Sequence, residues 1–180
     1  MRDFRIAISF LLVLLFSSCQ PSLVDFATKW TKDIKGEIIK DANQQPTRIV
    51  YDSAGHDITL FKGDKKLKYF WFKPEVNNLG HTIFKDTGVV IFYSSDQNFE
   101  YVKELCPVSD RSFEGIKYKG EFIGLTEFRY CNGMIKKSGF SYNGDSEVLK
   151  EYDSTGKIIK DNEAANINYL KEILKIKYDR

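Results

Sequence analysis

Two histidines, His56 and His81, are the only imidazoles in the chain, and they set a narrow limit on acid-base chemistry. Ser53, His56 and Asp57 have the side chains of a nucleophile, a base and an orienting acid, but they lie within one short turn. A catalytic triad takes its members from separate elements. We therefore interpret His56 as a turn residue and His81, which follows Gly80, as a loop residue.

The chain also lacks the short motifs that carry common enzyme chemistry. It contains no His-Glu-x-x-His zinc motif, no Gly-x-Ser-x-Gly elbow, no phosphate-binding Gly-Lys-Ser/Thr loop and no EF-hand calcium loop. Carboxylates are plentiful, yet a glycosidase pair is defined by a separation in space that a sequence does not give. We predict a non-enzyme without catalytic residues, metal or cofactor. The alternative is a hydrolase with an unrecognised site, which a deep pocket lined by two converging carboxylates would support.

The segment Tyr69-Phe70-Trp71-Phe72 is the strongest candidate for ligand binding. Side chains alternate along a strand, so Leu67, Tyr69 and Trp71 share one face, while Phe70 and Phe72 share the other. One interpretation is a central strand that is covered on both faces. The other is that Tyr69 and Trp71 line a groove and stack on a sugar, a peptide or a lipid, because aromatic rings with polar rims favour recognition.

The N-terminus has the pattern of an export signal. Arg2 and Arg5 precede an apolar run from Ile6 to Phe16, and small residues follow before Cys19. The run is much shorter than the roughly 20 apolar residues that a membrane-spanning helix requires. A basic head, a short apolar run and small residues before a cleavage point are typical of a secretory signal. We predict that residues 1–18 are a cleaved signal peptide.

The segment Leu15-Phe16-Ser17-Ser18-Cys19 resembles the lipobox of bacterial lipoproteins, with Phe16 where Leu is usual. Boxes of this looser kind, in a chain rich in Ile, Lys, Asn, Tyr and Phe, are similar to those of Bacteroidetes lipoproteins. The resemblance implies that the Cys19 thiol carries a diacylglyceryl group and that its new amino group carries an acyl chain such as palmitate. Two or more acyl chains hold a protein stably on a membrane.

The predicted tether is short, because only Gln20 and Pro21 separate Cys19 from the next patterned segment. We predict that residues 19–21 are the lipidated cysteine and its tether, and that residues 22–180 form one domain close to the bilayer. Surface-exported lipoproteins of this group tend to carry acidic residues after the cysteine, and none of the four residues after Cys19 is acidic. We therefore expect an outer-membrane anchor with the domain facing the periplasm.

Lipidation would leave Cys106 and Cys131 as an even pair in an oxidising compartment. A disulfide between them would stabilise the fold by roughly 3.5 kcal/mol on the chain-entropy model. The alternative is two separate buried thiols that pack as small apolar side chains. No Cys-x-x-Cys occurs, so neither a thioredoxin-like motif nor a cysteine zinc site is indicated.

Composition indicates one ordinary globular domain. The chain has 180 residues, of which 42% are hydrophobic and 29% charged, with a net charge of +2. The near-neutral balance lacks the positive patch of a dedicated nucleic-acid binder, so we expect no nucleic-acid partner. No Ser/Gly-rich linker divides the chain.

The patterning predicts a mainly β or α+β fold, in which an antiparallel meander carries a short N-terminal helix and a C-terminal helix. Ser22 can cap the first helix, where Leu23, Phe26, Ala27 and Trp30 share one face. The second covers residues 162–178 and carries a stripe of Ile167, Leu170, Ile173 and Leu174. Aromatic and β-branched runs broken by Gly, Asn and Asp predict strands at Glu37 to Lys40, Thr47 to Tyr51, Asp57 to Phe61, Leu67 to Phe72, Val89 to Tyr93, Phe99 to Leu105, Phe113 to Tyr118, Glu121 to Cys131, Met134 to Tyr142, Glu147 to Tyr152 and Lys157 to Lys160.

Short repeats accompany these strands. Tyr51-Asp52-Ser53-Ala54-Gly55 recurs as Tyr152-Asp153-Ser154-Thr155-Gly156, each a strand end with a polar turn closed by Gly. Asn132-Gly133 and Asn143-Gly144 are dipeptides favoured where both turn residues need positive φ. Residues 113–160 resemble the MORN-repeat-variant families of bacteria, in which Tyr or Phe and two glycines mark hairpins that stack into a sheet. That resemblance implies an interaction module, of which some are antitoxin-like or immunity-like.

These observations together predict a lipid-anchored, non-catalytic envelope protein that presents an antiparallel sheet to another macromolecule, in an immunity-like or assembly role. Its partners would be the membrane, through the acyl chains, and a protein. The alternative is a ligand carrier or glycan-binding lipoprotein that uses Tyr69 and Trp71. The oligomeric state does not follow from the sequence.

Overall fold

The computed structural model describes residues 23–52, 56–106, 111–142 and 145–162. These residues form one helix, α2 (Leu23–Ala42), followed by ten strands. Every strand pairs antiparallel with the next one in the chain, so the spatial order of the strands is their sequence order. The predicted mainly-β antiparallel meander is therefore confirmed. The strands are β1 (Arg48–Tyr51), β2 (Asp57–Lys62), β3 (Lys65–Val76), β4 (Thr82–Tyr93), β5 (Phe99–Glu104), β6 (Arg111–Tyr118), β7 (Glu121–Tyr130), β8 (Ile135–Tyr142), β9 (Asp145–Tyr152) and β10 (Ile158–Asp161).

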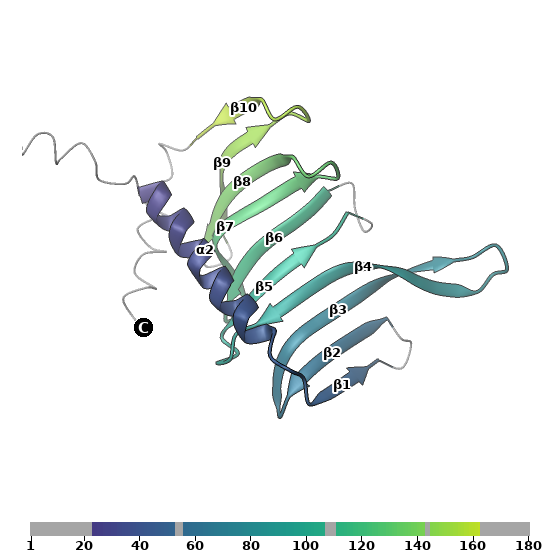
Figure 1. Cartoon of the computed structure of the whole chain (residues 1–180). Helices are drawn as coiled ribbons and strands as arrows, with labels where there is room; N and C mark the ends of the chain where they lie inside the picture. Colours follow the sequence, from purple (N-terminus) through teal and green to yellow (C-terminus); the bar gives the residue numbers. More distant parts are fainter. Residues whose placement is uncertain (1–22, 53–55, 107–110, 143–144, 163–180) are drawn as a thin grey trace, which may run out of the picture.

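Helix α2 crosses the strands on one face of a twisted, curved sheet (Figure 1). Its buried stripe of Trp30, Ile34 and Ile38 recurs every four residues and packs on the middle of the sheet. The sheet contributes Phe99, Tyr101, Ile116, Ile123, Phe140 and Leu149 to this core. Full burial of a large apolar side chain contributes about 1.5–3 kcal/mol. This layer of contacts holds the helix to the sheet.

The N-terminal helix is longer than predicted, and the predicted strand from Glu37 to Lys40 is wrong. Those residues form the last turns of α2, which runs for 20 residues. Ile38 and Ile39 gave the segment a β-branched appearance, but Ile38 continues the helical stripe and is 1% exposed. Burial against the sheet outweighs the local preference of two isoleucines.

The remaining predicted strands are all confirmed, with small shifts at their ends. The main difference is that β3 and β4 continue outward as a long hairpin, whose tip around residues 76–82 extends beyond the rest of the sheet (Figure 1). His81, predicted to be a loop residue, lies in the turn at this tip. At the tip the Asn77 carboxamide oxygen accepts the backbone N–H groups of Leu79 and His81, which organises the turn.

Two turns differ in detail from the sequence pattern. In Asn132-Gly133 only Gly133 has positive φ, +86°, whereas Lys119 and Gly120 both do, at 50° and 92°. Among the described turns, the β6–β7 hairpin is therefore one with two left-handed residues, and the predicted Asn143-Gly144 turn lies outside the described residues. The second copy of the repeat forms the expected turn, since Asp153 accepts the backbone N–H groups of Thr155 and Lys157.

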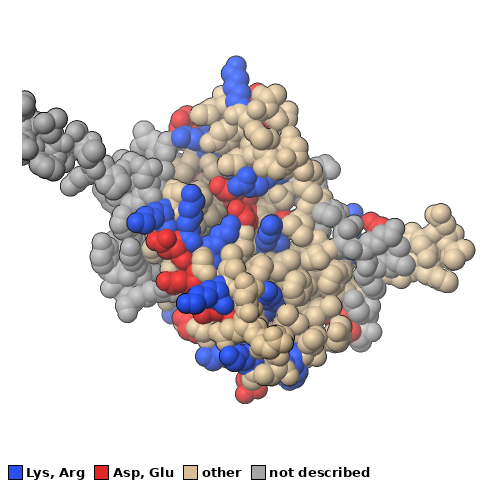
Figure 2. Space-filling model, viewed as in Figure 1, with Lys and Arg blue, Asp and Glu red and all other residues tan. Residues whose placement is uncertain are grey.

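The predicted C-terminal helix, residues 162–178, lies outside the described residues except for Asn162, and so do the predicted signal and Cys19. Among the residues described, none of the helical structure combines the length and apolar character needed to cross a bilayer. The solvent-facing side of α2 carries charged side chains of both signs, which Figure 2 shows gathered over the helix.

Candidate functional site

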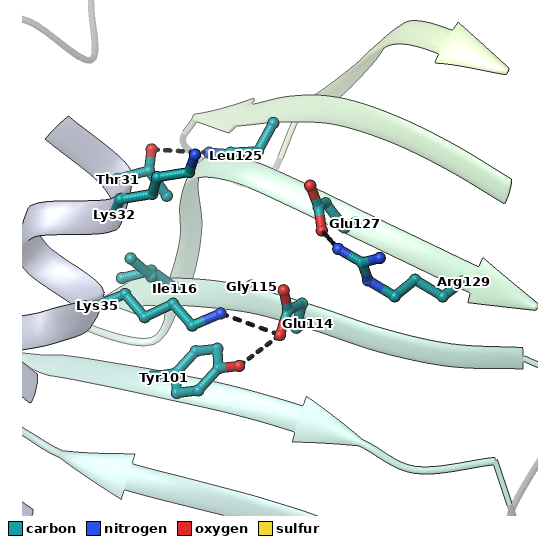
Figure 3. Close-up of a pocket in the computed structure, with 10 residues that line it drawn as sticks. All are labelled: Thr31, Lys32, Lys35, Tyr101, Glu114, Gly115, Ile116, Leu125, Glu127 and Arg129. Carbon is teal, nitrogen blue, oxygen red and sulfur yellow. Dashed lines mark hydrogen bonds and ion pairs between the residues drawn. The ribbon is translucent and has the colours of Figure 1, made fainter. Parts of the chain in front are cut away.

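A charged pocket lies where α2 passes over β5, β6 and β7 (Figure 3). Its volume is roughly 290 Å³. Lys35 reaches down from the helix, and its Nζ lies 3.1 Å from Glu114 Oε2. The Tyr101 hydroxyl donates to the same oxygen over 2.5 Å. On the neighbouring strand Glu127 pairs with the Arg129 guanidinium.

The sheet register explains why the two carboxylates meet. Glu114 of β6 and Glu127 of β7 are direct partners across the strand pair, and their side chains share the face that α2 covers. The Lys35 side chain is only partly exposed, and its ammonium also lies 4.5 Å from the centre of the Tyr101 ring. A cation therefore lies beside each carboxylate.

The electrostatics of the pocket keep Glu114 ionised. Partial burial alone would raise the pKa of Glu114, but the hydrogen bond from Tyr101 and the Lys35 ammonium outweigh burial and lower it. Burial, followed by the hydrogen bond to Glu114, raises the pKa of the Tyr101 phenol. The phenol thus stays protonated while it donates to the carboxylate.

The pocket has one of the two features that a glycoside hydrolase requires. Two carboxylates do converge on one pocket, but glycoside hydrolysis also needs a carboxylic acid whose pKa is raised so that it can protonate a leaving group. Glu114 has the opposite shift, and Glu127 is paired with Arg129. The Lys35–Glu114 contact attaches α2 to the sheet.

The opposite face of the sheet carries an apolar groove. Its volume is roughly 470 Å³, and it spans β5 to β9. Three aromatic rings form its wall: the Phe113 ring centre lies 5.1 Å from that of Phe122 and 4.8 Å from that of Phe128. Val102 and Val148 extend the apolar surface toward the two ends. The described residues place no helix over this face.

Two glycines let the groove form. A Cβ on Gly115 would lie 3.0 Å from the Phe113 ring and 3.2 Å from the Phe122 ring, so the rings lie directly over the strand. A Cβ on Gly139 would lie 2.4 Å from the Glu147 carbonyl oxygen, so β8 and β9 approach closely there. These two glycines lie within strands β6 and β8, where they shape the surface of the groove.

Polar groups surround the apolar wall. Ser141 and Ser146 form a hydroxyl pair 2.7 Å apart, and Thr126 donates to the Gly139 carbonyl over 3.3 Å. Lys137 and Glu104 also line the groove and give it charges of both signs. Ser141 and Thr126 are buried, whereas Ser146, Lys137 and Glu104 are at least partly exposed and form a polar rim beside the apolar rings, as at a protein recognition surface.

The predicted pair Tyr69 and Trp71 lies on the same outer face, on β3. Both side chains are partly exposed, whereas Leu67 on the same face is 5% exposed. Burial and then the neighbouring Asp57 carboxylate raise the pKa of Tyr69 to about 12. Asp57 is the register partner of Trp71, and its Oδ1 is buried without a hydrogen-bond partner among the described residues.

The predicted disulfide between Cys106 and Cys131 is present, with their Cα atoms 5.5 Å apart. Cys106 follows β5 and Cys131 follows β7, so the bridge joins the ends of two strands that flank β6. It lies beside the Glu104 end of the outer groove and restrains β5 and β7, the strands that carry Val102 and Phe128.

The charged pocket and the outer groove were not among the predicted sites. Lys35 had been placed just before a strand, so nothing in the sequence brought it to Glu114. The alternation of Phe113, Phe122 and Phe128 with polar residues was the available signal for the groove, but it is equally typical of ordinary strands. No group of three or more His, Cys, Asp or Glu side chains suited to a metal ion occurs in the ranges that the structure describes.

Compared with known proteins, the chain matches no family model, no curated protein and no solved structure. The class of protein is therefore defined by its fold: a ten-stranded antiparallel meander with one long N-terminal helix across one face.

Proposed function

We propose that the protein is a lipid-anchored, non-catalytic component of the bacterial cell envelope that presents the outer face of its sheet to a protein partner. The anchor is inferred from the signal pattern and from Cys19 in its lipobox-like context. Three residues between Cys19 and α2 would hold the domain near the outer membrane, on its periplasmic side. An immunity-like or assembly role is the most specific form of this proposal, in keeping with the resemblance of residues 113–160 to MORN-repeat-variant modules.

The outer groove is the observation that carries the binding part of the proposal. It joins three phenylalanine rings on a floor that includes Gly115 and Gly139, on a sheet face that the described helix leaves open. Aromatic residues are enriched in the buried centres of protein interfaces, and hydroxyl and charged groups at their rims. The groove has both parts. A partner that inserts one or two apolar side chains between Phe122 and Phe128 fits this chemistry.

The anchor is tested by Cys19→Ala in the full chain. The variant loses the acylation site but none of the described contacts, so we expect it to leave the membrane fraction and keep its circular dichroism spectrum. Cys106→Ser, which leaves Cys19 intact, is the control and is expected to stay with the membrane. Persistence of Cys19→Ala in the membrane fraction would contradict a lipid anchor.

The binding surface is tested by Phe122→Glu and Phe128→Glu, expressed in the native host. Each places a charge in the groove, and we expect the protein solubilised from envelopes to lose a larger complex that the unmodified chain forms. Lys119→Glu, in the exposed β6–β7 turn, is the matched control. Equal complex sizes for all four proteins would contradict binding through the groove, provided the groove variants retain their near-ultraviolet spectrum.

A second candidate is recognition of a glycan or similar polar ligand by Tyr69 and Trp71. The observation in its favour is that Tyr69 and Trp71 are partly exposed on one face of β3, with the carboxylate of Asp57, the register partner of Trp71, beside them. A hydrogen-bond acceptor next to aromatic rings is suited to a sugar, whose hydroxyls donate and whose C–H face stacks. Titration of Trp71 fluorescence with soluble oligosaccharides tests this candidate, with Trp71→Phe as control. No change in fluorescence with any neutral or charged oligosaccharide would contradict it.

A further inference from the structure

The two edges of the sheet differ in a way that indicates a partner. The edges are β1 and β10, each four residues long with every residue exposed. Strand β10 has a register shift between Ile158 and Lys160, and a bulge of this kind twists an edge away from further pairing. Strand β1 pairs with β2 in unbroken register and contains neither Lys nor Pro, so among the described residues its protection is limited to its short length and one charged side chain, Arg48.

The hydrogen-bond phase of β1 shows which backbone groups point outward. Asp52 N–H donates to the Asp57 carbonyl, so Asp52, Val50 and Arg48 make the ladder bonds to β2. In an antiparallel pair the intervening residues point their N–H and C=O groups the other way. The N–H and C=O groups of Ile49 and Tyr51 therefore face the open edge, ready to accept another strand.

The side chains of β1 are unusually apolar for an exposed edge. Ile49, Val50 and Tyr51 are 49%, 41% and 63% exposed. Alternation places Ile49 and Tyr51 on the face that α2 covers elsewhere, and Arg48, Val50 and Asp52 on the outer face. A basic and an acidic residue thus flank a central valine on one face, with Arg48 stacked over the Phe61 ring at 4.4 Å.

We propose that β1 pairs antiparallel with β1 of a second copy of this chain, about a two-fold axis through Val50. Ile49 then lies opposite Tyr51 of the second copy, and their outward N–H and C=O groups form four backbone hydrogen bonds. Arg48 lies opposite Asp52 of the second copy, and the two-fold axis repeats this ion pair on the other side of Val50. A shift of two residues in either direction loses both ion pairs, so the charges select one register.

This self-complementarity is specific to β1. The sequence of β10, Ile158-Ile159-Lys160-Asp161, offers no register in which both charged residues meet opposite charges about a two-fold axis while its hydrogen bonds stay regular across the bulge. Pairing of β1 with β10 of another copy would leave one edge open on each side and produce a filament, whereas pairing of β1 with itself closes as a dimer. The contact is small, so the dimer is expected to be reversible.

The dimer is independent of the proposed function, but it bears on how the outer face would be presented. A two-fold axis perpendicular to a continuous sheet leaves equivalent faces on the same side. Both outer grooves would therefore face one direction, and a partner with two binding segments would engage both copies at once.

Cysteine cross-linking of the full chain tests the register directly. Val50 would occupy a pair without backbone hydrogen bonds, where the two Cα atoms lie about 4.5 Å apart, within the range for a disulfide. We expect Val50→Cys to give a disulfide-linked dimer on a non-reducing gel. Ile49→Cys is the matched control, because Ile49 faces Tyr51 and not itself. Equal cross-linking of the two variants, or none with Val50→Cys beyond the wild-type background, would overturn the proposal.

Charge exchange provides a second measurement. Arg48→Asp alone and Asp52→Arg alone each replace two attractive pairs by two repulsive ones, and we expect each to weaken self-association about 10- to 30-fold in sedimentation experiments. An equimolar mixture restores both ion pairs and should form the mixed dimer. Failure of the mixture to associate more strongly than either variant alone, with both variants folded, would overturn the register.

Discussion

Leu125 donates its backbone N–H to Thr31 Oγ1 over 3.1 Å, which joins strand β7 directly to helix α2. The contact is possible because the preceding Gly124 has φ of +74° and no side chain: a Cβ there would lie 2.8 Å from the same Thr31 oxygen. The lack of a side chain at Gly124 therefore allows this close approach of α2 to β7.

The first prediction follows from this contact. Gly124→Ala should lower the free energy of unfolding by about 2–3 kcal/mol, because it adds a clash with Thr31 to the strain of a positive φ. Gly120→Ala is the control: its φ is +92° but no atom lies within 4 Å of the added Cβ. We expect about 1 kcal/mol for the control, measured by urea unfolding. Equal losses at the two glycines would show that α2 does not pack there.

A second prediction concerns pH. The pKa of folded Glu114 lies below its ordinary value of 4.5, so the ionised carboxylate stabilises the fold above about pH 4.5. That contribution is lost as the pH falls through the lowered, folded-state pKa. Glu114→Gln should therefore be destabilised relative to wild type at neutral pH and approach it in acid. Glu121→Gln, an exposed carboxylate at the start of β7, is the control. A wild-type advantage that persists unchanged to pH 2 would contradict the Lys35–Glu114–Tyr101 contacts.

A third prediction concerns the disulfide. Cys106 and Cys131 are 25 positions apart, and on the chain-entropy model their bridge contributes roughly 3.5 kcal/mol. Reduction, or Cys106→Ser with Cys131→Ser, should lower the unfolding midpoint accordingly. Thiol titration of the unfolded, unreduced chain should find neither cysteine free. Two titratable thiols at these positions would contradict the bridge.

A fourth prediction separates the two tryptophans. Trp30, on the sheet-facing side of α2, is 5% exposed, whereas Trp71 is partly exposed on the outer face. Acrylamide should quench the fluorescence of Trp30→Phe, which retains Trp71, severalfold more strongly than that of Trp71→Phe. Similar quenching of the two variants would mean that Trp71 is covered, and this would remove the platform that a glycan requires.

The sequence predicted much of this fold because most of its signals are local. Alternating aromatic and β-branched runs, punctuated by turns such as Asp153 to Gly156, located the strands and their antiparallel order. The length of α2 could not be predicted in the same way, because Ile38 is helical only through its burial beneath the sheet. The same limit applies to the sites. Glu114 meets Lys35 across 79 positions of the chain, and no local pattern encodes that contact.

The outer groove illustrates a further limit. Phe113, Phe122 and Phe128 are separated by a turn and by a register shift between Glu114 and Ile116, so their convergence depends on a bulge that the residue pattern does not mark. Tyr69 and Trp71 were predicted correctly to share a face, because only alternation within one strand was needed.

The central claim is that the outer face of the sheet contacts a protein partner in the cell. Photo-cross-linking with benzoylphenylalanine in place of Phe122, and separately of Phe128, measures this contact directly, with Tyr118 on the α2-covered face as the matched aromatic control. We expect one adduct of the same mass from both groove positions and none from position 118. Adducts from all three positions alike, or no adduct from either groove position in intact cells, would contradict it.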